Sequence, residues 1–131
     1  MSASYKIAQA AGLLGVSDDT VRRWVDQGVL PVTDASPTEI PGEALARHAI
    51  ALAKSSDDAT GVLSSARNRF TGLVTGIVMD QVVAQVEIQA GPHRVVSVMT
   101  AEAVRDLGLE VGSLAVAVVK ATMVIVEAPA P

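Results

Sequence analysis

Isolated cations stand beside small hydroxyl residues at two places in the second half of the chain. The segment "SARNRFTG" holds Arg67 and Arg69 at the threshold of a long apolar region, and Lys120 interrupts the apolar run "AVAVVKATMVIV". A partly desolvated ammonium favours a negative partner, so these residues could form an anion site. Lys120 has a second interpretation, as a charge that protects a strand edge from aggregation. The pattern of residues alone leaves both interpretations open.

The residue types near these cations suit a small anion with several oxygens. A doubly charged tetrahedral ion needs many short donors, which hydroxyls, main-chain N–H groups and one or two cations supply. Carboxylates would repel it, and neither "SARNRFTG" nor "KAT" contains one. The residues that a thiol-dependent reaction or a metal site needs are missing: cysteine is absent, and neither His48 nor His93 has a second histidine nearby. Without a Ser/His/Asp arrangement or a nucleotide loop, we predict that the protein is not an enzyme.

Composition limits the partners and the location that we expect. A chain of 131 residues fits one domain or two very small ones. The aromatic fraction of 2% excludes stacking platforms for single-stranded nucleic acid. The net charge of −4 gives no bulk attraction for DNA, so DNA binding would depend on local placement of charge or on oligomerisation. No apolar run is long enough for a leader or a membrane span, and we expect a cytoplasmic protein.

The first half of the chain has the apolar spacing of helices. One face, Ile7 to Leu14, is closed by Gly15, and Ser17 then has the place of an N-cap with two aspartates after it. The second helix should end at Gly28 and bury Val21, Trp24 and Val25, which leaves Arg22 and Arg23 on its other face. A third helical pattern covers residues 43–53.

The second half has the period of strands. In "VVAQVEIQA" apolar and polar residues alternate, "GP" supplies a turn into "HRVVSVMT", and "SLAVAVVKATMVIVE" reads as a last pair of strands. Thr100 should cap one short helix in between. We predict an α+β protein: a helical domain over 1–54, a linker over 55–63, a small barrel over 64–127 and a disordered tail over 128–131.

The run "YKIAQAAGLLGVSDDTVRRWVDQGVLP" resembles the opening of MerR-like and excisionase-like helix-turn-helix domains, which are winged-helix-like. The resemblance implies that the second helix enters the major groove of DNA, with four residues at phosphates or base edges: Ser17, Thr20, Arg22 and Arg23. The segment that corresponds to the usual basic wing, "VTDASPTEIPG", has two acidic residues and no basic one. Residues 1–60 contain five basic and eight acidic residues, a charge of 5 − 8 = −3. The helical half could therefore instead be a docking or dimerisation module.

The second half resembles the Mop domain of molybdate-binding proteins, also called a TOBE domain, through three motifs: "SARN", "TAEAVRDLGL" and "KAT". The resemblance implies a five-stranded barrel related to the oligonucleotide-binding fold, with molybdate or tungstate bound between subunits. By motif, one chain would contribute six residues and a neighbour would contribute Thr100; the six are Ser65, Ala66, Arg67, Lys120, Ala121 and Thr122. The family often has a serine three positions after that threonine, where this chain has Ala103.

Two functions join these halves. The first is a molybdate-responsive transcription regulator, in which the anion favours one assembly geometry and so changes the affinity for DNA. The alternative is a molybdate store, or molbindin, with the helical half as an adapter. Both need a homo-oligomer, a dimer or a hexamer as the family resemblance implies, because the expected sites lie between chains.

Overall fold

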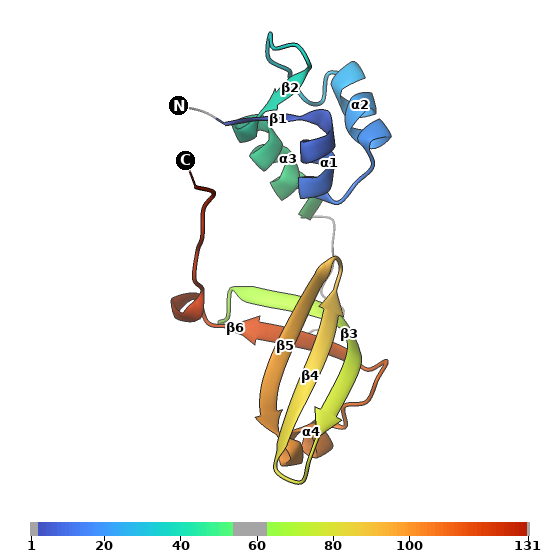
Figure 1. The fold of residues 1–131 in the computed structure, drawn as a ribbon, viewed down its shortest axis with the longest axis vertical. Coiled ribbons are helices and arrows are strands. Elements are labelled where there is room, and N and C mark those ends of the chain that lie inside the picture. Colours follow the sequence, from blue (N-terminus) through green and yellow to red (C-terminus); the bar gives the residue numbers. More distant parts are fainter. Residues whose placement is uncertain (1–2, 54–62, 131) are drawn as a thin grey trace. The chain divides into compact units, whose positions relative to one another are not determined.

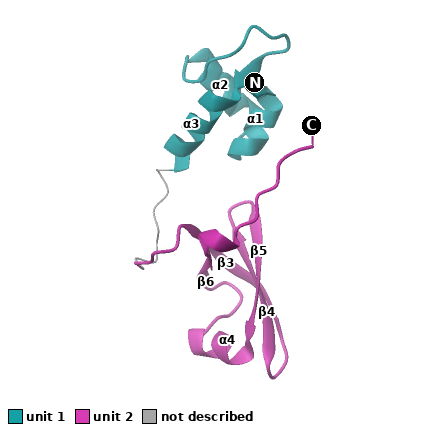
Figure 2. Ribbon diagram, turned by 90° about the vertical axis from the view of Figure 1, so that its left-hand side faces the viewer, with its two compact units in different colours: residues 1–57 teal, residues 58–131 magenta. Residues whose placement is uncertain are grey.

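The computed structural model describes residues 3–53 and 63–130 of the chain. Its contacts divide the chain into two compact units, residues 1–57 and 58–131, which Figure 2 shows in different colours. The predicted linker, 55–63, lies outside the described residues except for Leu63. The exact domain boundaries stay a prediction, and each unit is described by itself below.

The first unit combines three helices with a small sheet (Figure 1). Its elements in chain order are β1 (Ser4–Lys6), α1 (Ile7–Leu14), α2 (Asp18–Asp26), β2 (Glu39–Pro41) and α3 (Gly42–Ala53). Residues from all three helices meet in one core, listed here in full: Ala10, Ala11, Val21, Leu30, Ile40 and Leu45. Trp24 and Val25 are half-buried and pack against this core, as the helical spacing predicts.

Local signals set the ends of the first two helices. Gly15 follows α1 with φ of 70°, a left-handed conformation that glycine adopts without steric cost. Ser17 is the N-cap of α2, and its side-chain oxygen accepts a hydrogen bond from the Thr20 N–H. Asp18 and Asp19 lie in the first turn, where the helix dipole favours negative charge. These caps confirm the predicted start of α2.

The sequence analysis missed the two-stranded sheet of the first unit. β1 and β2 pair antiparallel with Tyr5 opposite Ile40. Each strand has only three residues, so neither shows the alternation by which strands are predicted. The sheet buries Ile40 completely and fastens the segment that precedes α3 to the start of the chain.

The second unit is a curled antiparallel sheet with one short helix (Figure 1). Its strands are β3 (Asn68–Met79), β4 (Val83–Ala90), β5 (His93–Thr100) and β6 (Leu114–Val119), in the spatial order β5-β4-β3-β6. The helix α4 (Ala101–Leu107) follows β5. Its core is Val74, Ala84, Val86, Ile88 and Val104. The predicted fold class, α+β with a helical half and an oligonucleotide-binding-like sheet, is confirmed.

The predicted last pair of strands is wrong in its second member. β6 ends at Val119, a short 3-10 helix η1 covers Ala121–Met123, and residues 124–130 form neither helix nor strand. A strand needs a ladder partner, and β6 itself is paired only with β3, so the described sheet has four strands instead of five. β5 and β6 remain its two open edges. Ile125 and Val126 are consequently 88% and 86% exposed.

None of the helices in the described ranges has the length and apolar character that a membrane crossing requires.

Candidate functional site

The register of β3 and β6 brings the two cation-bearing segments to the same end of one ladder. Asn68, the first residue of β3, lies opposite Val119, the last residue of β6. Arg67 directly precedes this pair and Lys120 directly follows it. The strands are antiparallel, so Arg67 and Lys120 leave the ladder side by side. The segments 65–67 and 120–122, far apart in the sequence, are thus attached to the same end of one ladder within one chain.

A side-chain hydrogen bond reinforces this end of the ladder. The Asn68 Nδ2 atom donates to the Val119 carbonyl at 3.2 Å, in a half-buried position. The sequence analysis did not select Asn68 as a site residue, although it belongs to the "SARN" motif. Only the pairing register, which joins residues 51 apart in the sequence, shows what its side chain contacts.

Tight turns hold the backbone on both sides of the site. Before β3, the Ala66 N–H donates to the Ser64 side-chain oxygen at 3.1 Å. After β6, the Met123 N–H donates to the Lys120 carbonyl at 2.9 Å, which closes η1 around Ala121 and Thr122. Ser65 and Thr122 are exposed, so their hydroxyls are accessible from outside the chain.

The electrostatics of this corner suit an anion. Among the described residues, neither Arg67 nor Lys120 forms an ion pair. No carboxylate occurs from residue 63 to 79 or from 111 to 126. Two cations without a described ion partner and two hydroxyls therefore flank this end of the ladder, in sequence segments that contain no carboxylate, and such a set of groups suits an anion. A metal cation is disfavoured here, and the described ranges contain no group of three His, Cys, Asp or Glu that could hold one.

Thr100 lies at the other end of the sheet. It pairs with Val83, beside the turn between β3 and β4, whereas Arg67 lies before the start of β3. The 12-residue strand β3 therefore separates Thr100 from the other predicted site residues of its own chain. Thr100 caps α4, and its Oγ1 accepts from the Ala103 N–H at 3.1 Å. Its hydroxyl proton stays available to a ligand carried by another chain.

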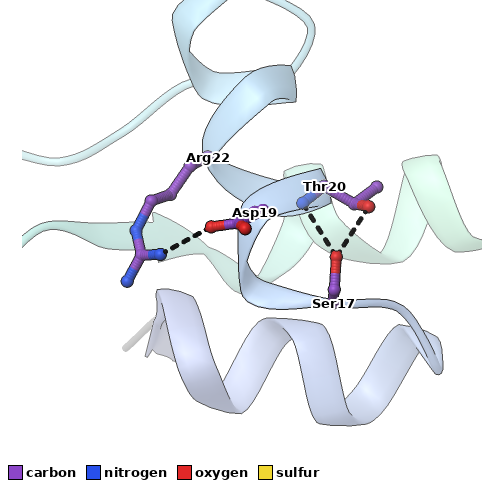
Figure 3. A network of polar contacts seen from close by, with 4 residues as sticks. All are labelled: Ser17, Asp19, Thr20 and Arg22. Carbon is purple, nitrogen blue, oxygen red and sulfur yellow. Dashed lines mark hydrogen bonds and ion pairs between the residues drawn. The ribbon is translucent and has the colours of Figure 1, made fainter.

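Three of the four predicted DNA-facing residues, Ser17, Thr20 and Arg22, make polar contacts at the start of α2 (Figure 3). The Ser17 side-chain oxygen accepts from the Thr20 N–H at 3.2 Å and lies 2.9 Å from the Thr20 hydroxyl. Arg22 Nη1 contacts Asp19 Oδ1 at 3.1 Å, with both side chains largely exposed. Arg23 is exposed and forms no ion pair with a described residue. The structure thus places Arg22 and Arg23 in different electrostatic states.

An apolar groove of about 480 Å³ opens in the second unit between its free edges. Val95, Met99 and Ser97 of β5 line it from one edge, and residues 114–119 of β6 line it from the other. Val86 and Ile88 of β4 also contribute to the lining. The groove therefore lies along the core face of the curled sheet, and Leu107 and Leu109 also line it.

Two family models match the chain. The TOBE domain matches residues 64–126, and a helix-turn-helix domain matches residues 4–48. No curated protein sequence matched the chain.

Three solved structures are similar to the second half of the chain. MopII from Clostridium pasteurianum is 36% identical over 50% of this chain and 100% of its own, with a TM-score of 0.48. A molybdate-binding protein from Sporomusa ovata is 31% identical over 51% of this chain and 100% of its own, with a TM-score of 0.49. The cytoplasmic molybdate-binding protein ModG, in a form with molybdate bound, is 42% identical over 49% of this chain and 46% of its own, with a TM-score of 0.44.

Family membership follows from sequence identity over the full length of two relatives and from the matching domain model. The chain belongs to the TOBE-domain family of Mop-type proteins, and a helix-turn-helix domain precedes its TOBE domain.

Proposed function

We propose that this protein binds molybdate or tungstate at the corner formed by β3 and β6. Ser65, Ala66 and Arg67 from one side, and Lys120, Ala121 and Thr122 from the other, would supply hydroxyls, backbone N–H groups and two cations. The observation that carries the proposal is the pairing of Asn68 with Val119, because it makes neighbours of segments 51 residues apart. Two of the similar proteins bind molybdate, and one of them holds it in its structure, which agrees with this ligand class.

Calorimetric titration of the full chain tests the ligand directly. Molybdate and tungstate should bind with measurable heat, and sulfate, which has the same charge and shape but is smaller, should bind more weakly. The donors of a rigid site match one ionic radius, so selectivity among such anions comes from the size of the cavity. Equal affinities for all three anions, or no binding of any of them, would contradict the proposal.

The site is completed by a second chain in this proposal. Thr100 lies a whole strand away from Lys120 of its own chain, so it can contribute only to the site of a neighbour. The open edges and the apolar groove supply the surface for such a neighbour, and the exposed segment 123–126, "MVIV", supplies apolar side chains to cover one. We therefore expect a homo-oligomer, a dimer or a hexamer.

Native mass spectrometry tests the assembly and its ligand together. The mass should be a multiple of the 13.5 kDa chain and should increase by whole numbers of oxyanions when molybdate is added. The variant Ile125→Asp puts a charge on the exposed apolar segment and should lower the subunit count. A monomer that binds one anion with unchanged affinity would contradict a site between chains.

The helix-turn-helix domain supports a molybdate-responsive transcription regulator that acts in the cytoplasm without catalysing a reaction. α2 would enter the major groove with Ser17, Thr20, Arg22 and Arg23 at its surface. Gel shifts on the promoter region of its own gene, at low salt and with and without molybdate, test this function. A shift that changes with molybdate supports it, and no shift under any condition contradicts it.

One observation favours the alternative of a molybdate store. Asp19 neutralises Arg22, and residues 31–38, between α2 and β2, contain Asp34 and no basic residue. Phosphate attraction is correspondingly weak for a single chain. A store predicts several bound anions per assembly and no DNA binding, so the gel shift and the mass measurement separate the two functions.

A further inference from the structure

The hydrogen bond from Asn68 to Val119 differs from most other side-chain bonds of the second unit. Asp80, Thr100 and Ser113 accept hydrogen bonds from residues two or three positions away. Asn68 instead joins the first residue of one strand to the last residue of another, across 51 positions. Loss of this bond would therefore loosen a tertiary contact, not a turn.

The position of this bond is the point where strand pairing stops. The register of β3 and β6 begins with Asn68 opposite Val119 and continues away from the site to Leu73 opposite Leu114. β6 is an edge strand, so no strand supports its other side. The ends of edge strands fray readily, since few contacts hold them. Arg67 and Lys120 are attached directly to this end.

The two cations also act against the closed arrangement. Arg67 and Lys120 carry like charges, and no described carboxylate is paired with either one. Their repulsion favours separation of the strand ends while the anion is absent. A hydrogen bond that spans the gap opposes this separation and keeps the donors in place before the ligand arrives, which raises affinity by reducing the cost of ordering.

We propose that Asn68 is a positioning residue of the oxyanion site. Its side-chain amide holds the Val119 carbonyl, and through it fixes Lys120 and η1 relative to Arg67. Asn68 itself need not touch the anion. This inference rests on the proposed function, because it assigns a role within the same site.

Two substitutions at Asn68 test this role. Asn68→Leu keeps a similar volume without a donor, and Asn68→Ala removes the amide altogether in case leucine disturbs folding. Each should weaken molybdate and tungstate binding about tenfold in calorimetry, which corresponds to one lost preorganising bond. Circular dichroism should show that the sheet persists.

The chain offers a matched control of the same chemistry. The Gln89 Nε2 atom donates to the Gly91 carbonyl at 2.9 Å, in the turn between β4 and β5. Gln89→Leu removes an amide-to-carbonyl bond away from the site and should leave the affinity within twofold of the original. Val74→Ala, a core change outside the groove lining, serves as a second control for a general loss of stability.

Amide hydrogen exchange supplies a readout that a merely stabilising bond would not move. In the anion-free protein, Asn68→Leu should speed exchange at Met123 and Val124, whose N–H groups bond to the Lys120 and Ala121 carbonyls, several-fold more than either control does. Affinity within twofold of the original, with unchanged exchange at these two amides, would overturn the positioning role alone. If the unmodified chain binds neither molybdate nor tungstate, the proposed function and the role of Asn68 both fall.

Discussion

The two units place their cations in opposite surroundings. In the helical unit, Arg22 lies 3.1 Å from Asp19, three residues earlier on the same helix. In the sheet unit, Arg67 and Lys120 stand at the end of one ladder with no described ion partner. The difference shows that the number of basic residues in a region says little about its ligand. What matters is whether the fold also supplies the acceptors that neutralise them.

The consequences for binding differ in kind. An exposed ion pair such as Arg22 with Asp19 stabilises the fold by about 0–1 kcal/mol, so a ligand can displace Asp19 from Arg22 at low cost. The ligand gains little from this, because the net charge of the pair is small. Arg67 and Lys120 have no ion partner to give up among the residues that the structure describes. A small dianion that reaches both would therefore gain charge-assisted hydrogen bonds with little loss elsewhere.

If the two units fold independently, destabilising one should leave the other unchanged. Gly72→Ala should test this and should have the largest effect of the variants. A Cβ at residue 72 would lie 2.2 Å from the Gln89 carbonyl oxygen, where β3 and β4 meet. We expect a loss of about 2–4 kcal/mol in the free energy of unfolding of the sheet unit. The fluorescence of Trp24, the single tryptophan and part of the helical unit, should follow an unchanged transition.

Gly76→Ala on the same strand is the matched control, because its Cβ would meet nothing closer than 3.6 Å. It should cost much less than Gly72→Ala. A parallel shift of the tryptophan transition in Gly72→Ala would show that the units unfold together and are not independent.

Lys120→Ala should give the next largest effect. It removes a charge-assisted hydrogen bond of about 2 kcal/mol, so molybdate affinity should fall about 30-fold in calorimetry. The double variant Arg22→Ala with Arg23→Ala removes two cations from the other unit and should leave the affinity unchanged. Full affinity in Lys120→Ala would leave this lysine as an edge-protecting charge only.

Asp19→Asn should sharpen the comparison from the side of the helical unit. It releases Arg22, so affinity for DNA at low salt should rise about fivefold, in line with about 1 kcal/mol for an exposed pair. The slope of log affinity against log salt should steepen by about 0.9, the value for one additional phosphate contact.

Asp26→Asn is the control for Asp19→Asn, since it changes the same charge on the same helix without a described ion pair. Equal gains in DNA affinity from both variants would indicate a bulk charge effect and not the release of Arg22 from Asp19.

Substitution of Asp80 should give the smallest effect. Backbone N–H groups hold this charge, whereas Arg22 has an ion partner, and Arg67 and Lys120 have no described one. The backbone N–H of Val83, and then that of Val82, lower the pKa of this carboxyl below its ordinary value of 3.8. A lowered pKa in the folded state means that the ionised form stabilises the turn. This stabilisation is present above pH 3.8 and disappears as the pH falls through the lower folded pKa.

Asp80→Ala should therefore lower the thermal midpoint of the sheet unit by about one or two degrees at pH 7 and by less at pH 3. Asp106→Ala, on an exposed position of α4, should lower it by less at pH 7. A loss for Asp80→Ala that does not depend on pH would assign the effect to the turn geometry and not to the charge.

Sequence reasoning reached the features that depend on near neighbours. The caps at Ser17 and Thr100 and the glycine that ends the first helix, Gly15, follow from a few adjacent residues, and the structure confirms them. The β1–β2 pair was missed because three residues cannot show a period. The fifth strand was predicted from its composition, but composition does not tell whether a partner strand exists in the same chain.

The candidate site divides in the same way. Its residues were identified through short motifs, whereas the adjacency of Arg67 and Lys120 depends on a register between distant strands. Asn68 was not selected for that reason, because an asparagine at the start of a strand has no evident role until its hydrogen bond to Val119 is known.

The two free sheet edges have a consequence for the life of a newly made chain. β5 and β6 each display unpaired backbone groups on one side, and any extended peptide can add to such an edge. As long as these edges are uncovered, the sheet unit is more prone to aggregate than the helical unit. If the proposed homo-oligomer covers these edges, the stability measured in solution should rise with protein concentration.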